Sequence, residues 1–154
     1  MEVISERIVI VENEKFQSST FAGKGKAMKK IIRTENAPAP IGPYNQAVKF
    51  GNMLFVSGQI ALDAQSGQMV DDSISQEAEK VMENLGAVLK EAGYSYGDIL
   101  KTSIFLSDMV LFDEVNAIYS KYFEKDFPAR ETVAVKGLPK NVNVEISVIA
   151  AKAE

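Results

Sequence analysis

Apolar residues recur along the chain with a helical period in two places. Between Ser73 and Gly93 they return every three or four positions, which predicts an amphipathic helix. Ser73 followed by Gln76 resembles a capping box at the start of this helix, and Gly93 provides a stop at its end. A second helix of the same kind is predicted further on, capped by Ser107 or Asp108.

Shorter apolar runs predict the strands of a sheet. The expected strands cover residues 53–60, 99–106, 131–136 and 142–151. The pair Gly51-Asn52 lies between two apolar runs, which is typical of a tight hairpin and adds one strand before it. The predicted order is β-β-α-β-α-β-β, an α/β (α+β) subunit in which two helices cover one face of a mixed sheet.

The second face of this sheet is also expected to be apolar. The runs MLFVSGQI at 53–60 and SIFL at 103–106 carry apolar side chains on both sides. A single copy of the chain would leave that face in water. We therefore expect self-association into a closed ring or dimer.

Residues 1–27 differ in composition from the rest of the chain. Residues 3–11 are strand-like, residues 17–26 are polar and rich in glycine, and Met28 begins a segment that resembles a new start. We interpret 1–27 as an N-terminal extension before a domain at 28–154. A tag, an alternative start and a partner-binding arm all remain open for it.

Composition restricts the chemistry. The 154 residues include neither cysteine nor histidine, which excludes a disulfide framework, a thiol nucleophile and a Ser-His-Asp triad. Proton transfer must therefore use Asp, Glu, Lys, Tyr, the backbone or water. The 17 basic and 21 acidic residues give a net charge of −4 without a basic patch, so nucleic acid is not an expected partner. We expect no metal and, because no apolar run reaches ~18 residues, a soluble cytoplasmic protein.

Two charged residues near the C-terminus are candidates for chemistry. Arg130 follows Phe-Pro-Ala at the start of a predicted strand, and its planar guanidinium suits a carboxylate. Glu145 lies within a predicted strand between apolar neighbours, where a carboxylate is rarely left unpaired. The two residues form either a structural ion pair or the working groups of a pocket.

Three further positions interrupt the regular pattern. In Ser57-Gly58-Gln59, a glycine within a strand marks either a β-bulge or the close approach of another group. Tyr44, in Gly-Pro-Tyr, either projects from a turn or packs against it. Asn116, within the second predicted helix, would ordinarily be a solvated position.

Four segments together resemble the Rid/YjgF family of reactive intermediate deaminases, and the resemblance extends from Met28 to the C-terminus. They read TENAPAPIGPYNQAV at 34–48, MLFVSGQIAL at 53–62, GDILKTSIFLSDM at 97–109 and FPARETVAVKGLPKNVNVEISVIA at 127–150. The resemblance implies a chorismate-mutase-like subunit and a homotrimer with clefts between subunits. It also implies hydrolysis, without a cofactor, of enamines and imines such as 2-aminoacrylate and 2-iminopropanoate to 2-oxo acids and ammonia.

The resemblance implies a role for individual residues as well. Arg130 would bind the substrate carboxylate, and Glu145 would position the attacking water. Five residues would line the cleft: Tyr44, Ser57, Gly58, Asn116 and Thr132.

The chain departs from the family pattern at two positions. Thr132 stands where many members have cysteine, which indicates that no thiol nucleophile is needed, although the hydroxyl could shift substrate preference. Glu131 stands where many have a small residue. Strand alternation should point it away from Arg130, where it could perturb a subunit contact or lower the affinity for anionic substrates.

Three other functions stay open from the sequence. The first is an endoribonuclease, which the acidic balance and the lack of histidine disfavour. The second is a binding module that senses small acids at the same clefts, for which Arg130 would matter and Glu145 would not. The third is a chaperone-like or purely structural trimer, for which neither residue would matter.

Overall fold

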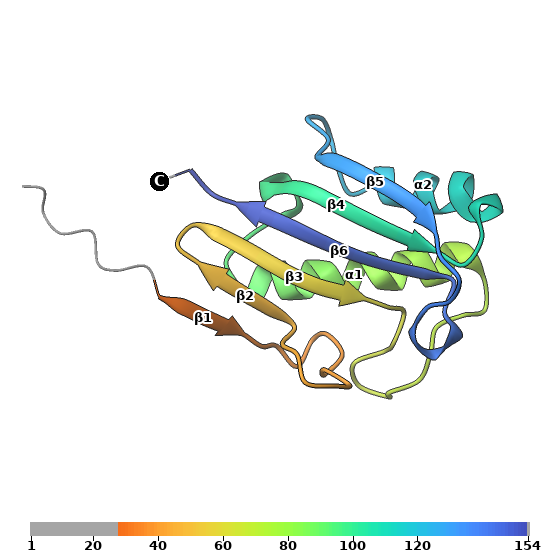
Figure 1. Ribbon diagram of the computed structural model, residues 1–154, viewed down its shortest axis with the longest axis horizontal. Coiled ribbons are helices and arrows are strands. Elements are labelled where there is room, and N and C mark those ends of the chain that lie inside the picture. Colours follow the sequence, from red (N-terminus) through yellow and green to blue (C-terminus); the bar gives the residue numbers. More distant parts are fainter. Residues whose placement is uncertain (1–27, 154) are drawn as a thin grey trace, which may run out of the picture.

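The computed structural model describes residues 28–153, so the predicted N-terminal extension lies outside the described residues. Within this range the chain forms one sheet and two α-helices (Figure 1). The strands are β1 (Lys29–Ile32), β2 (Ala47–Phe50), β3 (Met53–Gln59), β4 (Ile99–Leu106), β5 (Ala129–Ala134) and β6 (Val144–Ala151). The helices are α1 (Ile74–Glu91) and α2 (Phe112–Ser120), and single 3₁₀ turns cover Tyr96–Asp98, Met109–Leu111 and Pro139–Asn141.

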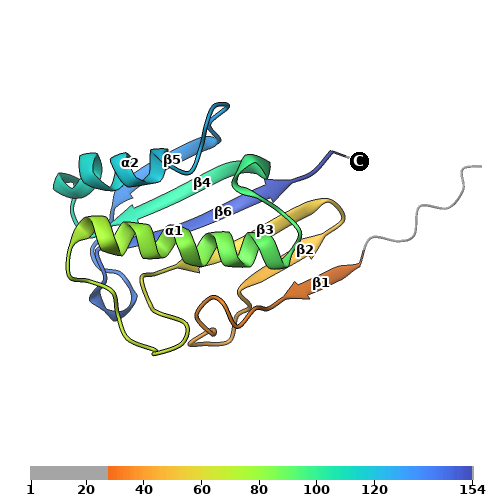
Figure 2. The same cartoon turned by 180° about the vertical axis from the view of Figure 1, so that it is seen from behind.

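The six strands form a mixed sheet in the order β1-β2-β3-β6-β4-β5. Only the β4–β5 pair is parallel, and α2 lies in the crossover connection that a parallel pair requires. Both helices lie on the same face of the sheet, in front of it in Figure 2 and behind it in Figure 1. The predicted α+β architecture with two helices on one face is therefore confirmed.

Two predictions about the strands are wrong, one about their number and one about where a strand begins. Strand β1 was not expected, so the observed order is β-β-β-α-β-α-β-β. Its four residues, KKII, do not alternate, and the strand exists because it pairs with β2 at the edge of the sheet. Strand β5 begins two residues earlier than predicted, which places Arg130 inside the strand.

Local signals set the helix ends as the sequence predicted. The Ser73 side chain accepts a hydrogen bond from the N–H of Gln76 at 3.2 Å. Gly93 follows α1 with a φ of +80°, a left-handed conformation that favours glycine. Of the two candidate caps for the second helical segment, Asp108 is the one used, because its side chain accepts from the N–H of Val110 at 2.9 Å.

The core lies between the helices and the sheet. Strand β6, in the middle of the sheet, alternates between buried and half-buried residues. Its buried residues, Val144, Ile146, Val148 and Ala150, face the helices. By alternation, Glu145 and the residues two and four positions after it lie on the opposite, uncovered face.

The uncovered face carries large apolar side chains, as expected, beside polar ones such as Glu131 and Glu145. Large side chains there remain exposed in a single copy of the chain, which is consistent with a surface that associates with another copy. They are Phe50, Met53, Phe55 and Val133. No helix among residues 28–153 combines the length and the hydropathy needed to cross a membrane.

Candidate active site

Four of the predicted site residues meet in one cavity of about 490 Å³, which we call the glutamate cavity. They are Tyr44, Ser57, Gly58 and Glu145. Ile41, Val56, Ile60, Pro139 and Ser147 complete its lining. The cavity therefore combines one carboxylate and a few hydroxyl groups with mostly apolar walls, a composition typical of small-molecule sites.

Gly58 lies in a β-bulge and is also closely approached by another group, the two interpretations that its sequence position allowed. The β3–β6 register shifts by one residue between Val56 and Gln59, so Ser57 and Gly58 form a bulge. A Cβ atom at position 58 would overlap the carboxylate of Glu145, and it would lie 2.7 Å from the Glu145 Cδ atom. The missing side chain thus gives Glu145 its place in the cavity.

Burial raises the pKa of the Glu145 carboxyl group above its ordinary value of 4.5. No ion pair between residues 28 and 153 involves this carboxylate, so the structural ion pair considered for it is absent from the described chain. A carboxylate with a raised pKa is a stronger base than one with an ordinary pKa.

Glu145→Gln is expected to raise the melting temperature near neutral pH. Because the folded-state pKa is raised, the carboxyl stabilises the fold below its ordinary pKa and loses this contribution as pH rises through the folded-state value. An amide does not titrate, so the advantage of the variant should shrink as the solution is acidified towards about pH 4. Thermal unfolding as a function of pH measures this. An advantage that grows on acidification would contradict it.

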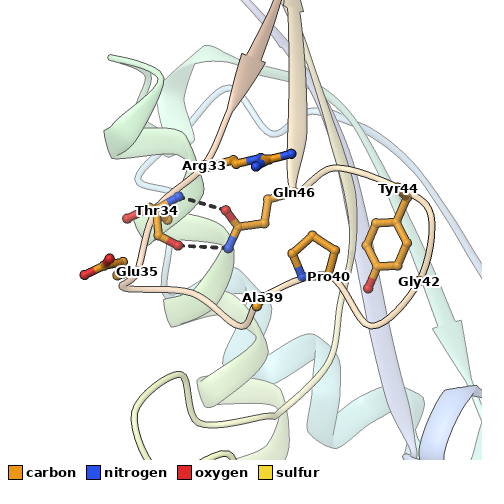
Figure 3. Close-up of a pocket in the computed structure, with 8 residues that line it drawn as sticks. All are labelled: Arg33, Thr34, Glu35, Ala39, Pro40, Gly42, Tyr44 and Gln46. Atoms are coloured by element: carbon orange, nitrogen blue, oxygen red, sulfur yellow. Dashed lines mark hydrogen bonds between the residues drawn. The ribbon is translucent and has the colours of Figure 1, made fainter.

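The loop that carries Tyr44 is organised by Gln46, a residue that the sequence analysis missed. Gln46 is buried, and its Oε1 accepts from the N–H of Thr34 at 2.8 Å (Figure 3). Its Nε2 donates to the carbonyl groups of Thr34, Ala37 and Pro38 at 2.9–3.0 Å. The only available signal was a glutamine directly before an apolar run, close to Tyr44.

The same loop is tied to the β3 bulge. Ser57 Oγ donates to the carbonyl of Asn45 at 2.7 Å, and the Ser57 N–H donates to the carbonyl of Gln46 at 3.0 Å. The Tyr44 hydroxyl accepts from the N–H of Ile41 at 3.2 Å. A larger cavity of about 570 Å³ lies against the same loop (Figure 3), but it is lined by neither Arg130 nor Glu145.

Arg130 lies in a separate cavity of about 410 Å³, the arginine cavity. Its Nη1 donates to Asn116 Oδ1 at 2.7 Å. Its guanidinium carbon lies 5.0 Å from the centre of the Tyr119 ring and 5.7 Å from that of Phe112. Asn116 and the two rings of α2 restrain the guanidinium plane, and within residues 28–153 one of its five N–H donors is used. The others are available to a planar anion such as a carboxylate.

The two cavities lie apart in one chain and share no lining residue. Strand β4 separates β5, which carries Arg130, from β6, which carries Glu145. Arg130 turns towards α2 on the covered side of the sheet, whereas Glu145 lies on the uncovered side. The described residues of one copy of the chain therefore do not bring Arg130 and Glu145 into one cavity.

Comparison with known proteins agrees with the motifs. The sequence model of the family described as Endoribonuclease L-PSP matches residues 34–152. The chain belongs to this family, the Rid/YjgF family.

Individual relatives give the family a wider context. RutC family protein PH0854 of Pyrococcus horikoshii is 48% identical over 81% of this chain and 99% of its own. The 2-iminobutanoate/2-iminopropanoate deaminase of Mus musculus is 43% identical over 81% of this chain and 93% of its own. The crystal structure of TdcF from E. coli with bound serine is 39% identical, covers 80% of this chain and 99% of its own, and has a TM-score of 0.78.

The structure places both positions at which this Rid/YjgF chain departs from the family pattern. Glu131 points away from Arg130, as predicted, because its carboxylate accepts from Ser103 Oγ and pairs with Lys101 Nζ on the other face. Lys101 and Ser103 hold the pKa of Glu131 below its ordinary value. Thr132 shares the face of Arg130, and its buried Oγ1 has no hydrogen-bond partner within residues 28–153.

Gly58→Ala is expected to displace the Glu145 carboxylate with little effect on stability. The added Cβ meets the end of a flexible side chain, which can swing away, so the free energy of unfolding should change by less than about 1 kcal/mol. A displacement of about 1 Å can reduce turnover roughly 100-fold. Gly137→Ala is the matched control, because a Cβ there meets nothing within 4 Å. Equal turnover in the two variants would contradict this role of Gly58.

Proposed function

We propose that this chain hydrolyses reactive imines and enamines of amino acids to 2-oxo acids and ammonia. The observation that carries the proposal is the complementarity of the two half-sites. One holds a restrained guanidinium suited to a carboxylate, and the other a half-buried carboxylate with a raised pKa. The name of the mouse relative, a 2-iminobutanoate/2-iminopropanoate deaminase, supports this reaction. The serine bound to TdcF supports a small amino-acid-like ligand.

The reaction needs placement and modest proton movement. The enamine tautomerises to an imine, and Arg130 holds its carboxylate so that the imine carbon faces the Glu145 carboxylate. Glu145 takes a proton from water as the oxygen attacks that carbon, and the proton passes to the nitrogen. The hydroxyl proton of the carbinolamine then passes to the nitrogen as the C–N bond breaks, which releases ammonia and leaves the carbonyl of the 2-oxo acid. Such base assistance contributes typically 10²–10⁴-fold, roughly, to the rate.

We also propose that the arginine cavity of one subunit faces the glutamate cavity of a neighbour within a homotrimer. The separation of the half-sites in one chain and the apolar uncovered face support self-association. The number three comes from the family resemblance. On this proposal Tyr44, Ser57 and Gly58 line the cleft from one subunit, and Asn116 and Thr132 from the other. A cytoplasmic location fits this activity.

Ammonia release from enzymatically generated 2-iminopropanoate tests the proposed activity. The protein should accelerate release over the spontaneous rate in proportion to its concentration. No acceleration at any concentration, combined with tight binding of pyruvate, would favour the sensor alternative instead.

The family description names an endoribonuclease, so RNA cleavage is the alternative to exclude. A protein of net charge −4 should bind RNA weakly, with a shallow dependence on salt. RNA cleavage that persists in the Arg130→Ala and Glu145→Gln variants would point to a different site.

A further inference from the structure

We infer that Glu77 is a positioning residue that holds Glu145 in the glutamate cavity through the start of strand β6. The inference rests on the proposed function. It concerns a buried carboxylate that takes no part in the chemistry and lies on the other side of the sheet from the cavity.

Glu77 makes three hydrogen bonds to the beginning of β6. It is 1% exposed and lies in the first turn of α1. Its Oε1 accepts from the N–H groups of Asn143 at 2.6 Å and Val144 at 3.0 Å. Its Oε2 accepts from Asn143 Nδ2 at 2.9 Å. One helix side chain thus satisfies two successive backbone donors, and the next residue in the strand is Glu145.

The turn that leads into β6 needs such support. Lys140 and Asn141 have φ values of 56° and 58°, so two successive non-glycine residues are in the left-handed region. A turn of this kind persists only where the surrounding structure holds it. Pro139, at the start of the turn, lines the glutamate cavity, so relaxation of the turn would also move a wall of the site.

Asn143 connects the start of β6 to the end of strand β4 as well as to α1. Its carbonyl accepts from the N–H of Ser107 at 3.0 Å, and its Oδ1 accepts from Ser107 Oγ at 2.9 Å. Ser107 directly follows β4, so Glu77 and Ser107 fix Asn143 from the helix and from the neighbouring strand. These contacts define where β6 starts and in which plane its first peptides lie.

The position of the Glu145 carboxylate depends on how the first peptides of β6 are placed. Its carboxylate packs closely over Gly58, where even a methyl group would overlap it. A small rotation or shift of the first β6 peptides therefore changes where the carboxylate lies, while Arg130 lies on a different strand, β5, and is held by Asn116 of α2. Loss of the support should lower turnover and leave carboxylate binding unchanged.

Two substitutions at Glu77 distinguish the effect of its side-chain length from the effect of its charge. Glu77→Asp keeps the charge but retracts the carboxylate by one methylene, so the bonds to Asn143 and Val144 should be lost. Glu77→Gln removes the charge and the bond from Asn143 Nδ2 but keeps an oxygen for both backbone donors. We expect kcat to fall roughly 10- to 100-fold in the aspartate variant and to stay within about threefold in the glutamine variant. The Kd for pyruvate, measured by calorimetry, should stay within about twofold in both.

Val81→Ala is the matched control for stability. Val81 is fully buried one turn further along α1, makes no hydrogen bond through its side chain and lines neither the glutamate cavity nor the arginine cavity. Its substitution should lower the melting temperature without changing kcat below the transition. Amide hydrogen exchange of Asn143 and Val144 reports directly whether the support is lost in each variant.

The inference is overturned if Glu77→Asp exposes these amides to exchange and retains full turnover. It is also overturned if Val81→Ala, at a comparable melting temperature, loses as much turnover as Glu77→Asp. Failure of the proposed function looks different, because the unsubstituted protein would then fail to accelerate ammonia release.

Discussion

Arg130→Ala is expected to abolish accelerated ammonia release and to weaken pyruvate binding, with the fold and the oligomer intact. The guanidinium is restrained by Asn116 and two aromatic rings, so it meets a carboxylate without further ordering. Truncating one partner of such a charge pair costs about 2–5 kcal/mol, which corresponds to a loss of roughly 30-fold or more in affinity. Arg130 is exposed in the single chain, so little packing is lost.

Two further variants make this result specific. Arg130→Lys keeps the charge but loses the planar fork, so it should recover only part of the binding. Lys121→Ala removes another exposed cation, at the end of α2, and should leave both turnover and binding unchanged. Full activity of Arg130→Ala in the unchanged oligomer would reject the arginine cavity as the carboxylate site.

Glu145→Gln is expected to retain pyruvate binding and to lose turnover by roughly 10²–10⁴-fold. The amide fills the same space over Gly58 and is neutral, but it cannot take a proton from water. Because burial raises the pKa of Glu145, turnover of the unsubstituted protein should also fall on acidification at a higher pH than an ordinary carboxyl would give.

Steady-state kinetics with enzymatically generated 2-iminopropanoate, together with calorimetry of pyruvate, measures both effects. Lys121→Ala is again a suitable control, because Lys121 lines neither cavity. Unchanged turnover in Glu145→Gln would remove the base role and favour a binding module. Loss of pyruvate binding would instead place Glu145 among the groups that hold the ligand.

The parts of the fold that the sequence predicts correctly are those set by local chemistry. Ser73 marks the start of α1 and Gly93 its end through contacts within a few residues, and Gly51-Asn52 closes the β2–β3 hairpin. Strand β1 and the start of β5 depend on pairing with distant strands. Short segments such as KKII carry no periodic pattern from which that pairing could be predicted.

The same division applies to the site. Motifs select Arg130 and Glu145 as candidates, and strand alternation correctly predicts that Glu131 points away from Arg130. The sequence does not predict that the two half-sites lie apart in one chain, because this depends on strand order. The supporting residues were missed although Glu77 carried a signal. It lies three residues after Ile74 and four before Val81, so the apolar stripe of α1 contains a charge that needs a buried partner.

Mixing two inactive variants tests the central claim, a site shared between subunits, most directly. In a trimer that contains both Arg130→Ala and Glu145→Gln subunits, one interface combines an intact Arg130 with an intact Glu145. Refolding the variants together in equal amounts should therefore restore about a quarter of the unsubstituted activity, whereas each variant alone stays inactive. No recovery in verified mixed trimers would contradict the account, because the two residues would then have to act from the same subunit.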